Sequence, residues 1–362
     1  MTDLVQHSVR VITAHQAPTG AYVASPHFPV YRYSWFRDGA FIAYAMDLAG
    51  QHGSARSFHD WATRTILRHA HKAERAIEKA ARGEPLGQDY LHTRYTVEGE
   101  EGPEGWPNFQ LDGFGTWLWA LNEHVQRTGV SLTSDGQAAV ALTARYLSAL
   151  WSRPCYDLWE EHPHYQHPYT LAAIYAGLRA AGTLLGAKGH ALIEVAEQVR
   201  RFVLTHGVQE GRLVKYIPPP SDPAYRIDAS LVGVATPYRL LAPEDPLMRA
   251  TVASIERELR CPRGGVHRYR ADTYYGGGEW VLLAAWLGWY YTEVAETHRA
   301  RELLDWVEAQ ADAEGHLPEQ VSRHLLAPER YGEWEARWGP VAKPLLWSHA
   351  MYLILHHALR SA

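Results

Sequence analysis

The sequence is short of cysteine and of long apolar runs. Its two cysteines, Cys155 and Cys261, are too few for a disulfide framework or a four-thiolate zinc site. The longest run without a charged or strongly polar residue, 280–291, is well below the ~18 residues of a membrane-spanning helix. The first residues carry Asp3 where a secretory signal has an apolar stretch. We therefore expect a soluble, cytoplasmic protein that does not bind a membrane.

An excess of positive charge is also missing. The chain has 35 basic and 40 acidic residues, a net charge of −5 with neutral histidines, so we expect no nucleic-acid partner. With 46% hydrophobic and 21% charged residues, the composition is typical of globular proteins and excludes disordered and collagen-like classes.

Phenylalanine is scarce beside the other aromatic residues. The 14 tryptophans and 21 tyrosines outnumber the 7 phenylalanines fivefold. Because phenylalanine fills a core equally well, the bias favours rings whose polar edge faces water or a ligand. Such rings suit sugars, which have an apolar face and a hydroxylated rim. A bulky core built from tryptophan and tyrosine is the alternative interpretation.

Hydrophobic periodicity predicts helices almost throughout. The expected segments are 2–15, 37–50, 54–82, 112–128, 134–151, 168–186, 188–205, 228–240, 246–259, 279–293, 297–312 and 345–360. Ser134–Asp135 is a candidate N-cap, Gly129 a candidate helix end, and Pro168 fits a first helical turn.

Apolar and amphipathic segments alternate along the chain. Even-numbered segments are apolar nearly all round, as in buried helices, and odd-numbered ones carry a charged face. Six hairpins closed into a ring explain this pattern, so we predict an all-α, (α/α)6 toroid. A helical solenoid has the same local pattern, but no fixed-period repeat favours it. Since no linker divides the chain, we expect a single domain over residues 1–362.

Polar and aromatic clusters precede the even-numbered segments. In an alternating toroid the inner helices run in one direction, so these loops meet at one end and form a concave pocket. The clusters are Trp35-Phe-Arg37-Asp38, Gln110-Leu-Asp112, Leu158-Trp159-Glu160-Glu161, Arg268 to Asp272, Leu317-Pro-Glu319-Gln320, and Pro344-Leu-Leu-Trp347-Ser-His-Ala.

This ordered array of motifs resembles glycoside hydrolase family 15, which includes inverting, exo-acting α-glucosidases. The resemblance covers about residues 25 to 360 and implies roles for individual residues. Glu160 matches the general acid and Glu319 the general base that activates water. The implied substrate-binding residues are Tyr31, Trp35, Arg37, Asp38, Trp106, Leu158, Trp159, Glu161, Arg268, Asp272, Trp280 and Trp347.

Acetal hydrolysis independently requires two carboxyl groups in different protonation states. A separation of ~6.5–9.5 Å leaves room for a water molecule and inverts the anomeric centre. We expect burial and the charge of Glu161 to keep Glu160 protonated, and polar contacts to keep Glu319 ionised.

Each motif also has a simpler interpretation. Glu160 and Glu161 could begin a solvated helix, and Glu319 could be a surface-loop acid. Arg37 and Asp38 could form a structural ion pair. We expect no metal and no cofactor, because the cluster of His162, His164 and His167 does not match zinc spacings and fits a surface or pocket rim. His69 and His71 are expected to be solvated.

Short α-glucosides are the substrates that the sequence favours, with α-1,6 linkages slightly ahead of α-1,4. There is no room before Tyr31 for the N-terminal β-sandwich of many bacterial relatives, so a homodimer is a candidate cover for that side. Alternatives are a trehalase-like hydrolase, an epimerase or unsaturated-glycoside hydrolase on the same toroid, and a non-catalytic glucoside-binding or regulatory protein.

Overall fold

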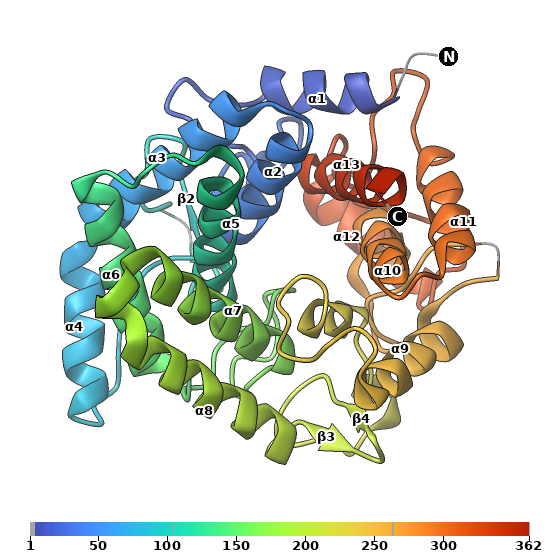
Figure 1. Cartoon of the computed structure of the whole chain (residues 1–362). Coiled ribbons are helices and arrows are strands. Elements are labelled where there is room, and N and C mark those ends of the chain that lie inside the picture. The colour runs from blue at the N-terminus through green and yellow to red at the C-terminus, as the bar shows by residue number, and fades with distance from the viewer. Residues whose placement is uncertain (1–3, 104, 263, 362) are drawn as a thin grey trace.

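Helices dominate the structure, a computed structural model that describes residues 4–103, 105–262 and 264–361. They form two rings, one inside the other (Figure 1). The inner ring contains α2 (Phe36–Leu48), α5 (Asp112–Thr128), α7 (Pro168–Leu185), the 3₁₀-helix η4 (Ala229–Val234), α10 (Val281–Glu293) and α13 (Leu346–Ser361). The outer ring contains α1 (Leu4–Ala14), α3 (His52–Arg68), α4 (Ala70–Ala81), α6 (Ser134–Leu150), α8 (His190–His206), α9 (Pro246–Leu259) and α11 (Thr297–Glu308).

The inner ring is closed. Each inner helix contacts the next along the chain, and α13 returns to pack against α2. Helix α1 packs on the outside of α13, so the first and last helices complete the outer layer together. The predicted (α/α)6 toroid is confirmed.

The two rings differ in burial as their sequences predict. Every residue of α10 from Val281 to Tyr291 is buried, whereas α8 buries only one stripe, Ala196, Val199 and Val203. Inner helices also approach each other closely, because a Cβ atom at Gly177 of α7 would lie 2.6 Å from the Cα of Gly115 in α5. Only glycine allows that approach.

Helix ends follow local chemistry. Helix α5 ends at Gly129, whose φ of 70° is left-handed, and α7 begins at Pro168, both as predicted. The predicted cap of α6 is wrong by one residue. Thr133 is the N-cap, and its Oγ1 accepts a hydrogen bond from the Gly136 N–H at 3.1 Å.

Two predicted helices are wrong in extent. The segment 54–82 is two helices, α3 and α4, separated at His69. That side chain is buried rather than solvated, and its Nε2 lies 3.0 Å from the Gly99 carbonyl; His71 is exposed. The segment 228–240 is helical over η4, which ends before Pro237, a residue that cannot donate in a helix interior.

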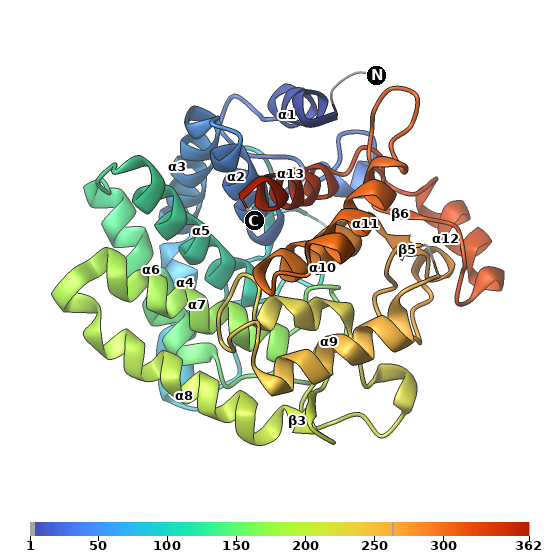
Figure 2. The ribbon, with the colours of Figure 1, turned by 45° about the vertical axis from the view of Figure 1, so that its right-hand side comes forward.

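Short two-stranded ladders fix the loops at the end where the inner helices begin. β1 (Ser34–Trp35) pairs with β2 (Arg94–Tyr95), and β5 (Glu279–Trp280) pairs with β6 (Gln320–Val321). Helix α12 (Tyr331–Trp338), which the sequence analysis missed, lies beside β5 and β6 at the edge of the molecule (Figure 2). A third ladder joins β3 (Val208–Gln209) and β4 (Arg212–Leu213).

One stretch, Pro168–His206, is apolar enough on average to pass for a membrane span. It consists of α7 and α8 with a 3₁₀ turn between them, and 67% of its most apolar 18-residue window is buried inside the protein. Its composition is therefore explained by the core of the toroid.

Candidate active site

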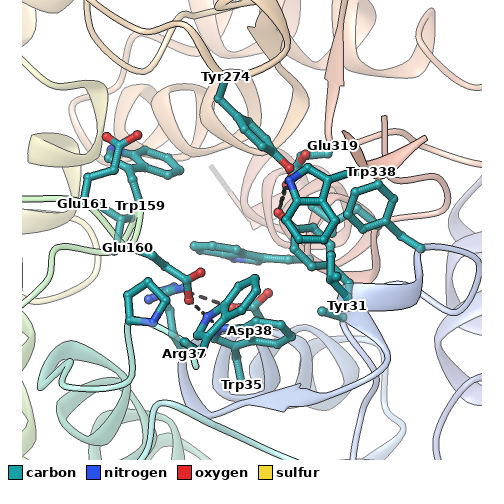
Figure 3. A pocket seen from close by; sticks show the side chains of 18 of the residues that line it. Tyr31, Trp35, Arg37, Asp38, Trp159, Glu160, Glu161, Tyr274, Glu319 and Trp338 are labelled. Carbon is teal, nitrogen blue, oxygen red and sulfur yellow. Dashed lines mark hydrogen bonds and ion pairs between the residues drawn. The ribbon is translucent and has the colours of Figure 1, made fainter. Parts of the chain in front are cut away.

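The loops that precede the inner helices line a cavity of about 370 Å³ (Figure 3). This is the convergence that the alternating pattern predicts. The predicted site residues that line it are Tyr31, Trp35, Arg37, Asp38, Trp106, Leu158, Trp159, Glu160, Glu161, Arg268, Trp280, Glu319 and Trp347. Asp272 does not line this cavity, so its contact with substrate stays a prediction.

A tight turn presents Glu160 to the cavity. Asp157 organises the turn, because its Oδ1 accepts hydrogen bonds from the backbone N–H groups of Trp159 and Glu161, at 3.0 and 2.9 Å. Glu160 has a left-handed φ of 68°, a strained conformation for a side chain with a Cβ. Helix α7 begins only at Pro168, so Glu160 and Glu161 are not its N-terminus.

Two donors hold one oxygen of Glu160. The Trp35 indole N–H donates to Oε1 at 2.7 Å, and the Gln110 amide donates to the same oxygen at 3.1 Å. The orientation of that amide is fixed, because the Gln110 carbonyl oxygen accepts from Arg37 and Thr93, at 2.9 and 3.1 Å. The sequence motif contains Gln110 but does not reveal this contact.

Glu319 is almost fully enclosed, with 3% of its surface exposed, so it is not a surface-loop acid. Its Oε1 accepts from the Tyr31 hydroxyl at 3.2 Å, and that hydroxyl lies 2.9 Å from the Tyr274 hydroxyl. Its Oε2 is buried with no hydrogen-bond partner in the described part of the chain. That oxygen is therefore available to a molecule in the cavity.

The loop that carries Glu319 is tied to helix α13. Ser348 Oγ donates to the Pro318 carbonyl at 2.8 Å, and the Leu317 N–H donates to His349 Nε2 at 3.0 Å. The His349 pKa is lowered to about 3, chiefly by burial, so the ring is neutral and Nε2 can accept. Ser348 and His349, which follow the pocket-lining Trp347, therefore position the loop that carries Glu319.

Burial changes the protonation expected for Glu319. Its pKa is raised to about 8, because the desolvation of the charged form outweighs the stabilising charge of Arg268 and the hydrogen bond from Tyr31. Burial thus opposes the expected ionisation of Glu319, which stays a prediction. The pKa of Asp38 is raised to about 7, also by burial, against the opposing charge of Arg37.

A chain of ring contacts joins the two glutamates across the cavity. Trp35, which holds Glu160, packs edge-on against Tyr31, which holds Glu319, with 5.6 Å between ring centroids. Figure 3 shows Glu160 and Glu319 on opposite sides of the cavity. The two carboxyl groups therefore face one space from different loops.

Arg37 and Asp38 form an ion pair at the cavity floor, with Arg37 Nε and Asp38 Oδ2 3.5 Å apart. Arg37 also contacts Asp112 at 3.1 Å, which fixes its position. Both residues line the cavity, and Asp38 Oδ2 has no hydrogen-bond partner among the described residues.

Arg268 is held from behind by Asp272, whose two oxygens lie 2.8 and 2.5 Å from the guanidinium nitrogens. Asp272 Oδ1 also accepts from the Tyr274 N–H at 2.9 Å, so the observed role of Asp272 is to fix Arg268 and the loop beside it. Arg268 also contacts Glu161 at 3.4 Å, and Tyr269 donates to Glu161 at 2.6 Å.

The sequence analysis missed a buried ion-pair network behind Trp159. Lys215 lies 3.2 Å from Asp157 and 2.5 Å from Asp228, and the Trp159 indole N–H donates to Asp228 at 2.9 Å. Asp157 and Lys215 lie 58 positions apart, so no local pattern indicates the contact.

The second missed group lies on α12. Trp334, Arg337 and Trp338 line the cavity mouth, and Trp334 packs against Tyr274 with 4.9 Å between ring centroids. The spacing of Trp334 and Trp338, four residues apart, places both on one helix face and was the available signal.

The histidine cluster is divided. His164 is exposed, whereas His167 is buried and its Nε2 lies 3.0 Å from the Cys155 carbonyl. His162 lies near Asp157 and Glu161, which could hold a metal by distance, but the Lys215 ammonium group already neutralises Asp157. The cofactor-free expectation stays a prediction.

Six buried polar atoms of the cavity walls have no hydrogen-bond partner within the described residues: Arg37 Nε, Asp38 Oδ2, Glu319 Oε2 and the indole nitrogens of Trp106, Trp280 and Trp347. Donors and acceptors on aromatic walls match the hydroxyls and apolar faces of a sugar. Residues 1–313 match the profile of glycosyl hydrolases family 15.

This chain belongs to glycosyl hydrolases family 15. It is therefore a glycoside hydrolase, and family membership supports α-glucosidase activity. The chain is 43% identical to isomaltose glucohydrolase of Kribbella flavida, over 98% of this chain and 91% of that protein. It is 25% identical to Trehalase 2 of Sulfolobus acidocaldarius, over 80% of this chain but 53% of that protein. A glycosidase variant solved in complex with glucose superposes with a TM-score of 0.93 at 42% identity, over 99% of this chain and 96% of the other.

Proposed function

We propose that this family 15 enzyme is an inverting, exo-acting α-glucosidase that releases β-glucose from the non-reducing end of short α-glucosides, with isomaltose preferred to maltose. The observation that carries the proposal is the placement of Glu160 and Glu319 on opposite sides of one cavity. The similarity to an isomaltose glucohydrolase supports the choice of linkage.

In the proposed reaction, Glu160 donates a proton to the glycosidic oxygen as the bond to C1 breaks. A water molecule attacks C1 from the opposite face, and Glu319 Oε2 takes the proton that the water loses. Attack on that face inverts the configuration, so an α-glucoside yields β-glucose. Oε2 suits this role because it is the oxygen of Glu319 that lacks a hydrogen-bond partner among the described residues.

The first glucose would be held by side chains that neighbouring residues already fix around the cavity. The Arg37–Asp38 pair and Arg268 supply charged donors and acceptors for hydroxyls, and tryptophan walls cover the apolar ring faces. Because Asp112 and Asp272 fix the two arginines, little side-chain entropy remains to be lost on binding.

The decisive experiment follows the anomers of glucose by NMR while the purified enzyme hydrolyses isomaltose, maltose or trehalose. We expect β-glucose first and the highest kcat/KM for isomaltose. Initial α-glucose would exclude inversion, and faster hydrolysis of trehalose would replace the proposal by the trehalase alternative. The cytoplasmic location, the homodimer and the single domain stay predictions.

A further inference from the structure

A second group of chemically reactive side chains lies at the other end of the barrel, between α2, α3 and α5. Asp47 is near the end of α2, His59 is on α3, and His124 is in the last turns of α5. Arg37 and Asp47 are ten residues apart on α2, so this group lies about 15 Å along the helix from the cavity. The three helices are neighbours in both ribbon views (Figures 1 and 2).

All three side chains are buried, with 2–3% of each residue exposed. One ligand-type atom from each lies within 4.8 Å of the other two. His124 Nδ1 lies 2.9 Å from Asp47 Oδ2, and the rings of His59 and His124 have centroids 5.2 Å apart. Two imidazoles and a carboxylate therefore surround one point in the core.

His59 is the unusual member of this group. Neither of its ring nitrogens has a hydrogen-bond partner in the described structure, although both are buried. Buried polar groups without a hydrogen-bond partner are rare and destabilising, so a nitrogen that faces a carboxylate and a second imidazole indicates a missing ligand.

A fourth residue orients the carboxylate. His52 Nδ1 lies 2.8 Å from Asp47 Oδ1, and its side chain is 47% exposed. Carboxylates that bind metals are commonly hydrogen-bonded through their second oxygen, and a half-exposed residue gives an ion a path from solvent.

We propose that Asp47, His59 and His124 form a structural site for one divalent transition-metal ion, with Zn²⁺ as the preferred occupant and a water molecule in the fourth position. Nitrogen and oxygen donors in a set of three or four suit tetrahedral Zn²⁺, whereas Ca²⁺ and Mg²⁺ prefer all-oxygen sites. The ion would cross-link two inner helices to an outer one. It takes no part in hydrolysis.

The test uses the full-length enzyme without a histidine tag, stripped by a chelator and titrated with Co²⁺ while visible absorption is recorded. We expect one equivalent to bind with the intense bands of tetrahedral Co²⁺, displaced by Zn²⁺, and Zn²⁺ to raise the melting temperature. His59→Gln and Asp47→Asn should each weaken Co²⁺ binding by roughly 100-fold or more. His298→Gln, which changes a histidine side chain that is 88% exposed on α11, is the matched control and should bind like the wild type.

Absence of one-equivalent binding, or unchanged binding by folded His59→Gln, would overturn the site. Should both core variants fail to fold, anomalous diffraction from a Zn²⁺-loaded wild-type crystal decides. A peak between Asp47, His59 and His124 supports the proposal, and a peak elsewhere or none rejects it.

Discussion

At the scale of single residues, Glu160 and Glu319 differ in how the protein holds their oxygens. Glu160 is partly exposed to the cavity, and two side-chain N–H groups, from Trp35 and Gln110, meet at its Oε1. Glu319 is enclosed. Its Oε1 accepts a hydrogen bond from the Tyr31 hydroxyl, and its Oε2 has no hydrogen-bond partner among the described residues. Two carboxyl groups in such different surroundings are suited to different proton-transfer roles.

Replacing either glutamate tests those roles. Glu160→Gln and Glu319→Gln should each lower kcat by about 10²- to 10⁴-fold, because each removes one proton transfer. Glucose release and the melting temperature should be measured together. Loss of activity in a folded protein supports the assignment, and a kcat near that of the wild type would reject the residue concerned.

The pH dependence of kcat/KM should reveal the burial of Glu319. A general base acts when ionised, and its pKa is raised to about 8, so activity should rise with pH up to about 8. Tyr31→Phe removes a hydrogen bond that favours the carboxylate, which raises the pKa further and moves the acidic limb about one pH unit upward. Tyr90→Phe, whose hydroxyl contacts Gln88 on the surface, should leave the limb in place. A limb near pH 4.5 in the wild type would contradict this prediction.

The sequence predicted the cavity residues well because they occur in compact motifs at the starts of inner helices. It could not reveal that Asp272 fixes Arg268, since a sequence does not distinguish an acid that contacts substrate from one that positions an arginine. It could not reveal the pairing of Lys215 with Asp157 and Asp228, which depends on the packing of distant loops. The raised pKa of Glu319 could not be predicted from the sequence either, because desolvation depends on how the folded protein buries the side chain.

At the scale of elements, α12 is the least expected part of the site. It has no buried residue, yet its indoles line the cavity mouth. Its sequence, YGEWEARW, has one aromatic face, Tyr331, Trp334 and Trp338, but the segment is only eight residues long, so periodicity did not indicate a helix. Its partly buried rings pack against Phe28, Tyr275 and Ala342, so the helix is anchored where it can shape the cavity mouth.

Trp338→Ala should therefore affect binding more than chemistry. We expect KM for isomaltose to rise about tenfold with kcat changed little, because removing one packing ring forfeits ~1–1.5 kcal/mol. Trp151→Ala, which alters a ring that packs against Phe202 away from the cavity, is the control. An unchanged KM, or a loss confined to kcat, would exclude α12 from the substrate site.

Elsewhere the element predictions failed for local reasons. The break between α3 and α4 arises where His69 bonds to the Gly99 carbonyl, a contact 30 residues away. Pro237 was visible in the sequence and should have ended the segment 228–240 earlier. Helices with a clear cap or a strong apolar face, such as α5 and α9, were predicted with the observed bounds.

At the scale of the whole molecule, the cavity is a cost to stability. The folded pKa of Glu319 lies above its ordinary value of 4.5, so the fold favours the neutral form, and stability falls as pH rises from about 4.5 to 8. Glu319→Gln removes this cost. Its melting temperature should exceed that of the wild type by more at pH 9 than at pH 5, with a gain of a few kcal/mol at the higher pH.

Thermal unfolding at the two pH values measures the effect. The exposed Glu98→Gln variant is the control and should show no pH-dependent gain. An equal difference between wild type and Glu319→Gln at both pH values would show that burial does not raise the pKa of Glu319.

Because the first and last helices close the ring, the barrel cannot be completed until the end of the chain has been synthesised. The apolar flanks of α1 and α2 find their partner in α13, which leaves the ribosome about 300 residues after α2. At ~5–20 residues per second, that delay is roughly 15–60 s. A nascent chain must therefore keep Ile12 and its neighbours from aggregating for most of its synthesis, and chaperone capacity is expected to limit the yield of this enzyme on overexpression.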